Sequence, residues 1–189
     1  MADDLMLGVR RGLPDEVAYL RAANPREGWR AAPTFGQLAD FWLNVHAQLR
    51  REGGAVEALT AGLIDGSIAR ETFAPRFVAA LNQHLGHLDM HHGIEDQSYF
   101  PKFRALDVRM AAAFDLLEAD HAAVHRMLEE TVSSARGLLT ALAAGDAPRE
   151  AEAFAARSGQ LIALLDRHLA DEEEIVVPAM LVHGERALA

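Results

Sequence analysis

The chain has 189 residues, half of them hydrophobic, which is enough to bury the core of a single domain. Its net charge of −10 argues against nucleic acid and against an anionic membrane surface as partners, because both require a basic face. Cysteine is absent, which excludes disulfides and thiolate ligands and leaves histidine and carboxylate as the strong metal ligands.

The sequence also bears on location. No apolar run approaches the roughly 20 residues needed to span a bilayer. The start MADDLMLGVRRG is acidic and lacks the basic region and long apolar core of a secretory signal. We therefore expect a cytoplasmic protein.

Residues 1–33 are predicted to form a partly irregular N-terminal arm. This segment holds three prolines and shows no long helical period. A short helix is expected around Asp15 to Ala22, and the arm is expected to pack across the main domain, residues 34–184.

The first long helix of that domain is predicted to begin at Thr34. Thr34 and Gln37 have the spacing of a capping box, in which each side chain satisfies the other residue's free backbone N–H. The helix is expected to run to about Leu63, and His46 lies beside its apolar stripe.

A second helix is predicted from near Phe73 to near Phe103, ended or bent by Pro101. Polar, ionisable residues occupy core positions on its inward face. In steps of four and three, this face reads Phe77, Leu81, His84, Leu88, His91, Glu95 and Tyr99.

A third helix is predicted over residues 108–144, with Asp107 as its N-terminal cap. Its apolar stripe includes His121 and His125, which stand one turn apart. Both imidazoles should therefore project to the same side of the helix.

A fourth helix is predicted over residues 147–181, kinked or stopped by Pro178, and its stripe includes His168. The run Asp171 to Glu174 follows. A residue four positions on is rotated by about 40° from His168, and one five positions on by about 140°. Glu172 is therefore the preferred ligand, with Glu173 as the alternative if the helix is distorted, and the rest of the run is expected to be solvated.

Four long amphipathic helices with short connections and no strand pattern predict an all-α protein. The expected architecture is an antiparallel up-down-up-down four-helix bundle with a short N-terminal arm.

The helix stripes direct five imidazoles and two carboxylates into this bundle. They are His46, His91, Glu95, His121, His125, His168 and Glu172. Buried charges must be paired or bound to metal, and imidazole with carboxylate suits iron, zinc, manganese or copper. Two bridging acids and five terminal imidazoles suit a two-metal site with three histidines on one ion and two on the other. The second ion then keeps an open position.

Other polar residues near these positions have weaker interpretations. His87 is a group that contacts the site, an alternative ligand or a gate. His84 is either a group near the site or a half-exposed residue. Tyr99 either hydrogen-bonds the centre or packs in the core with a wet hydroxyl. His92 and His183 are predicted to be solvated.

The pattern resembles the hemerythrin-like family, the hemerythrin HHE cation-binding domain, in its bacterial form. The resemblance covers about residues 34–181. It is carried by His46, His91-x-x-x-Glu95 followed by Tyr99-Phe100-Pro101, His121-x-x-x-His125, and His168-x-x-x-Glu172. It implies a four-helix bundle that holds two non-haem iron ions, bridged by the two carboxylates and an oxo or hydroxo group. The similar oxygen carriers of invertebrates have an aspartate five residues after the last histidine, whereas this chain has a glutamate after four.

The resemblance implies a protein that binds O₂, NO or H₂O₂ for storage, scavenging or sensing. The alternative is an enzyme that turns over peroxide or NO, or that donates iron for the repair of iron centres. The expected partner is thus a small gaseous or peroxide ligand, and the sequence identifies no protein partner. A ferritin-like site is rejected because it needs four carboxylates and two Glu-x-x-His motifs, whereas this chain has one, Glu118 to His121.

Overall fold

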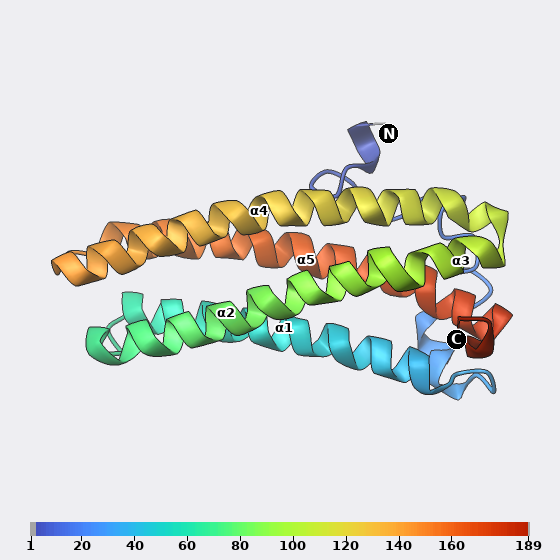
Figure 1. Cartoon of the computed structure of the whole chain (residues 1–189), viewed down its shortest axis with the longest axis horizontal. Coiled ribbons are helices and arrows are strands. Elements are labelled where there is room, and N and C mark those ends of the chain that lie inside the picture. Colours follow the sequence, from blue (N-terminus) through green and yellow to red (C-terminus); the bar gives the residue numbers. More distant parts are fainter. Residues whose placement is uncertain (1–2, 189) are drawn as a thin grey trace. The chain divides into compact units, whose positions relative to one another are not determined.

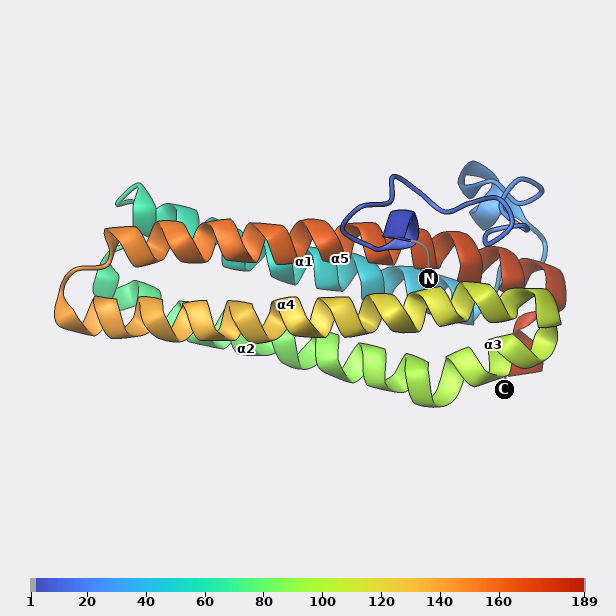
Figure 2. The ribbon, with the colours of Figure 1, turned by 90° about the horizontal axis from the view of Figure 1, so that it is seen from above.

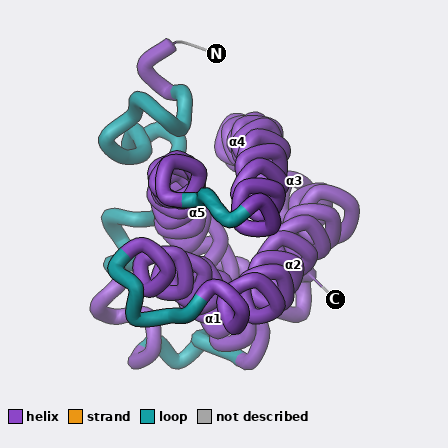
Figure 3. The backbone as a smooth tube through the Cα atoms, turned by 90° about the vertical axis from the view of Figure 1, so that its left-hand side faces the viewer, coloured by secondary structure: helices purple, strands orange, loops and turns teal. Residues whose placement is uncertain are grey.

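A computed structural model describes residues 3–188, and every regular element in that range is a helix (Figure 3). The prediction of an all-α protein is confirmed. The long helices are α1 (Gln37–Ile64), α2 (Arg70–Ile94), α4 (Ala111–Ala144) and α5 (Pro148–His183), with the short α3 (Phe100–Leu106) after α2 (Figure 1). No helix within residues 3–188 combines the length and hydrophobicity needed to cross a bilayer.

Five further short elements lie within residues 3–188. Four are 3₁₀ helices: η1 (Asp3–Leu5), η2 (Arg26–Ala31), η4 (Val108–Met110) and η5 (Glu185–Leu188). The fifth is a π-helical turn, η3 (Glu95–Tyr99), which joins α2 to α3.

The chain divides into two compact units, and each long helix contributes a segment to both. Unit 1 is the described part of Met1–Ala47, His91–Ala122 and Asp166–Ala189. Unit 2 is Gln48–Met90 and Ala123–Leu165. Each unit has its own hydrophobic core.

The core of unit 2 is built by all four long helices. Phe73 and Phe77 of α2 stack with ring centroids 4.9 Å apart, and Phe154 of α5 meets the Phe77 ring edge-on at 4.9 Å. Val56 of α1 and Leu138 of α4 belong to the same hydrophobic core. These side chains are at most 2% exposed, so the unit holds its helices through apolar packing.

The core of unit 1 joins the N-terminal arm to the helices. Leu13 of the arm is buried with Trp42 of α1, Phe103 of α3, Phe114 of α4 and Met180 of α5. Figure 2 shows the arm beside the C-terminal part of α5. The arm therefore packs against the helix segments of unit 1.

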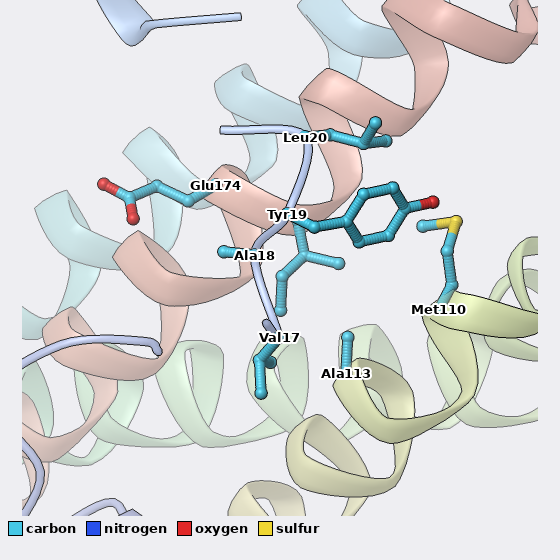
Figure 4. Close-up of a pocket in the computed structure, with 8 residues that line it drawn as sticks. Val17, Ala18, Tyr19, Leu20, Met110, Ala113 and Glu174 are labelled. Carbon is cyan, nitrogen blue, oxygen red and sulfur yellow. The ribbon is translucent and has the colours of Figure 1, made fainter. Parts of the chain in front are cut away.

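The arm has no helix where one was predicted. The segment 15–24 forms successive turns, with Ala18 N donating to Pro14 O at 3.0 Å and Arg21 N to Ala18 O at 2.9 Å. In Figure 4 this segment, from Val17 to Leu20, faces Met110. Packing against unit 1 therefore overrides the weak helical preference of a short segment.

The start of α1 is held by the far end of the chain. The Glu185 carboxylate accepts hydrogen bonds from Leu38 N at 3.0 Å and Ala39 N at 2.8 Å. A Cβ atom on Gly36 would collide with this carboxylate, so a larger residue there would force the Glu185 side chain to shift. Thr34 lies outside α1, and the predicted capping box is wrong.

The two prolines that were expected to end or bend a helix, Pro101 and Pro178, behave differently from each other. Pro101 falls in the first turn of α3, where a missing N–H costs nothing, and the π turn precedes it with Phe100 N donating to Glu95 O. Pro178 lies inside α5, which continues to His183. Pro178 therefore does not stop the helix.

Candidate metal centre

The first part of the site is a group of four buried side chains in unit 1. His46 comes from α1, His91 from the end of α2, Glu95 from the start of η3 and Glu172 from α5. One ligand atom from each lies within 4.8 Å of the others. His46 and Glu172 are fully buried.

The second part is a group of three histidines, also in unit 1. His92 comes from α2, His121 from α4 and His168 from α5, with ligand atoms within 4.8 Å of one another. The Nε2 atoms of His121 and His168 are 3.1 Å apart. The His92 ring stacks on the His121 ring at 4.0 Å.

Two carboxylates link these groups. Glu95 Oε1 lies 3.2 Å from His91 Nε2, and Glu95 Oε2 lies 3.5 Å from His121 Nε2. Glu172 Oε1 lies 3.2 Å from His46 Nε2, and Glu172 Oε2 lies 3.3 Å from His168 Nε2. Each acid thus directs one oxygen to each histidine group, which is the geometry of a carboxylate that bridges two cations.

Several polar atoms at this centre are buried without a hydrogen-bond partner within residues 3–188. They are His46 Nε2, His91 Nε2, Glu95 Oε1, Glu95 Oε2 and Glu172 Oε2. A buried polar group without a partner costs free energy. A metal ion satisfies imidazole nitrogens and carboxylate oxygens together, so the residues present fit a metal site.

Burial and charge shift the titration of both acids. Burial, and the neighbouring Glu172 charge, raise the pKa of Glu95 well above its usual value. Burial also works to raise the pKa of Glu172, but His46 and His168 outweigh it and hold that pKa well below its usual value.

The histidines titrate differently according to their partners. Burial, together with the charges of the neighbouring histidines, lowers the pKa of His91 to about 3 despite the opposing charge of Glu172. Burial works to lower the pKa of His168 as well, but hydrogen bonds with Asp120 and Glu172 raise it to about 9. Metal binding requires neutral imidazole, so loading must release the proton of His168.

Three of these histidines make a further polar contact through Nδ1. His46 Nδ1 lies 3.0 Å from Glu173 Oε1, and His121 Nδ1 lies 2.7 Å from Asp96 Oδ1. His168 Nδ1 lies 3.4 Å from an oxygen of Asp120. Such contacts fix the ring orientation and the tautomer of a metal-binding histidine.

The acidic residues after His168 were expected to be solvated apart from the ligand, and this prediction is wrong for two of them. Asp171 and Glu173 are 7% and 2% exposed. The arm supplies their counter-charges, because Arg10 Nε lies 2.7 Å from Asp171 and Arg26 Nη1 lies 2.6 Å from Glu173. A third arm residue, Arg21, lies 2.8 Å from Glu174. The arm arginines were not recognised as partners from the sequence, because they stand more than a hundred residues away.

Six of the seven predicted ligands belong to the two groups: His46, His91, Glu95, His121, His168 and Glu172. The seventh, His125, belongs to neither group. It lies in unit 2 with a side chain 41% exposed, and its Nδ1 atom is 3.9 Å from Asp89. His92 is fully buried in the second group, so the prediction that it is solvated is wrong.

The remaining predicted residues have other contacts. Glu173 forms an ion pair with Arg26, and its other oxygen contacts His46 Nδ1. Glu173 itself is not a member of the first group. The Tyr99 ring packs edge-on against Trp42 at 5.0 Å, and Trp42 Nε1 donates to Glu172 Oε1 at 2.5 Å.

His84 and His87 lie around Glu52 in unit 2. His87 Nδ1 lies 3.0 Å from Glu52 Oε2, and His84 Nδ1 lies 4.0 Å from the same oxygen. His84 is buried, and burial lowers its pKa against the opposing charge of Glu52. Neither histidine belongs to the two groups of the candidate centre.

The fold and the site define an all-helical metal-binding protein, because two buried histidine groups share two carboxylates. The chain matches the family described as hemerythrin HHE cation binding domain over residues 37–180. It belongs to that family, as the resemblance of its motifs indicated. Comparisons with curated proteins and with solved structures give no match.

Proposed function

We propose that the protein holds two non-haem iron ions and uses them to bind O₂, NO or H₂O₂ for storage, scavenging or sensing. The observation that carries this proposal is that Glu95 and Glu172 each direct one oxygen to each histidine group. Bound as a pair with an oxo or hydroxo bridge, iron would supply an open coordination position and redox chemistry for a small ligand.

The donor count favours ligand binding on one side of the site. The first group holds two histidines, His46 and His91, besides the shared acids, whereas the second holds three. An ion in the first group therefore has one protein ligand fewer. We propose that the small ligand binds there.

Residues around the site orient one of its carboxylates and give it apolar surroundings, which suits the binding of metal ions. Trp42 donates to Glu172 and keeps one oxygen of that acid oriented. Phe100 stacks on the His121 ring at 5.3 Å and, with the buried Phe103, excludes water from this side. A dry site strengthens the interactions of the ions with their carboxylates.

Family membership also favours an antiparallel arrangement of neighbouring helices. The connections between α1 and α2 and between α4 and α5 are short, as in antiparallel neighbours. We propose an up-down-up-down order of the helix segments within each unit. A cysteine-free, acidic chain favours action in the cytoplasm without a nucleic-acid or membrane partner.

Iron loading tests the metal centre. Protein loaded anaerobically with Fe²⁺ and desalted is expected to hold two iron ions per chain. Glu172→Gln keeps the side-chain volume but removes a bridging carboxylate, and is expected to lose the pair. Glu129→Gln changes an exposed acid of α4 and serves as the matched control. A wild-type chain that holds one tightly bound zinc ion and no iron pair would contradict the proposal.

Adding O₂, NO and H₂O₂ separately to the reduced protein tests the ligand. A stable adduct, seen as a persistent change in the ultraviolet–visible spectrum, is the expected result for a binding protein. Continuous consumption of the added molecule would instead identify an enzyme. No spectral change with any of the three would exclude this class of ligand.

A further inference from the structure

We propose that His92, and not His125, is the third histidine of the group that contains His121 and His168. This assignment rests on the proposed function, because it concerns which side chain completes the metal centre. It departs from the sequence pattern, in which His121-x-x-x-His125 presents two imidazoles from one helix.

The position of His92 inside unit 1 is the first argument. Its side chain is fully buried, although histidine is polar. The ring stacks on His121 with an interplanar angle of 13° and meets His168 edge-on at 5.3 Å. A ligand atom of His92 lies within 4.8 Å of one from each of these residues.

Helix geometry explains how neighbouring residues can serve two ions. Successive residues of a helix are rotated by about 100°, so His91 and His92 point to different sides. Glu95 is rotated by about 40° from His91, which places it between the two histidines around the helix axis. The ring centroids of His91 and His92 are 5.6 Å apart. One segment of α2 and η3 thus directs an imidazole to each group and a carboxylate between them.

The position of His125 is the second argument. The buried stripe of α4 passes through His121 and Val124 and continues at Thr131, leaving His125 at its edge. Its side chain is 41% exposed, and Asp89 lies 3.9 Å from its Nδ1 atom. A partly exposed imidazole beside a carboxylate need not bind metal.

The division of the chain into units is the third argument. With His92, all seven ligands belong to unit 1. His125 belongs to unit 2. A metal centre needs its ligands held at fixed separations, which a single compact unit provides.

A matched pair of variants tests the assignment. His92→Gln and His125→Gln each remove one imidazole and leave a side chain of similar size. Iron content after loading, the absorption band of the ferric pair and the rise in melting temperature on loading are measured for both. His92→Gln is expected to weaken iron binding at least ~10-fold and to abolish the band. His125→Gln is expected to stay within about twofold of wild type, as surface substitutions usually do.

Each alternative outcome has a distinct meaning. Loss of the iron pair in His125→Gln with retention in His92→Gln would overturn the assignment and leave the proposed function intact. Loss in both variants, or in neither, would also overturn it. A wild-type chain that binds no iron pair would contradict the proposed function itself.

Misfolding of the buried variant is tested separately. The far-ultraviolet circular dichroism and the melting temperature of metal-free His92→Gln should stay close to those of metal-free wild type. His92→Ala leaves a cavity of imidazole size, so added imidazole should restore the absorption band. Failure of imidazole to restore the band in folded His92→Ala, with iron retained by His92→Gln, would refute the assignment.

Discussion

Replacing Arg10 by alanine should strongly destabilise the metal-free protein. The Arg10 side chain is 1% exposed and lies between two buried carboxylates. Its Nε donates to Asp171 Oδ2 at 2.7 Å and its Nη1 to Asp120 Oδ1 at 2.8 Å. Its Nη2 also donates to Asp120 Oδ2. Removing this guanidinium leaves two buried acids without their counter-charge.

The expected loss follows from this burial. Removing one partner of a buried ion pair costs about 3–5 kcal/mol, because an uncompensated charge remains. Native domains are stable by about 5–15 kcal/mol, so Arg10→Ala should lose roughly a fifth or more of the total.

Urea unfolding of metal-free protein, followed by circular dichroism, measures the free energy of unfolding. Arg11→Ala is the matched control, since Arg11 is the exposed neighbour of Arg10 and the charge change is equal. The control should stay within about 0.5 kcal/mol of wild type. A loss below ~1 kcal/mol for Arg10→Ala would refute the reasoning, because the two acids would then not depend on this residue.

Three further changes have expected outcomes. Chelation of iron should lower the melting temperature, because free metal at 100 times its dissociation constant adds about 2.7 kcal/mol to the folded state; equal melting temperatures would contradict a buried centre. Glu52 is buried, which works to raise its pKa, but hydrogen bonds from Gln48, His87 and Gln83 hold that pKa below 4.5. Folding therefore favours the ionised acid, so Glu52→Gln should cost about 1 kcal/mol above pH 4.5 in urea unfolding. That difference should disappear as the pH falls through the lowered pKa, and a pH-independent difference would exclude the charge as its cause. Glu185→Ala should cost about 1 kcal/mol by freeing two N–H groups of α1; an equal loss in exposed Glu16→Ala would assign the effect to net charge.

Features set by local chemistry could be predicted from the sequence. Asp107 was predicted to cap the third helix, and its side chain accepts from Arg109 N at the start of η4. The third helix is predicted to end at residue 144, and α4 ends there; Gly145, which follows, has a φ of +87°, a conformation that favours glycine. The inward face of the second helix is likewise confirmed, with Phe77 and Leu88 fully buried. Each of these features depends on residues within a few positions of one another.

Features that depend on distant residues could not be predicted. Glu185 caps α1 from a position 146 or 147 residues away, and nothing near Gln37 indicates it. The acid run after His168 reads as a solvated surface until the arm arginines are known to cover it. His92 was assigned to solvent because the apolar stripe already included His91. The available indication was that Glu95 falls between His91 and His92 around the helix.

The ion pairs of the arm have a consequence for the order of folding. Arg10 contacts Asp120 and Asp171, which lie 110 and 161 positions further along the chain. Contacts of such long sequence separation carry a large loop-closure entropy and form slowly. During synthesis, Arg10 emerges long before either acid exists. The side of the centre that Asp120 and Glu173 support should therefore be assembled last, after the helices have formed. Iron that is present earlier would meet an incomplete set of oriented ligands.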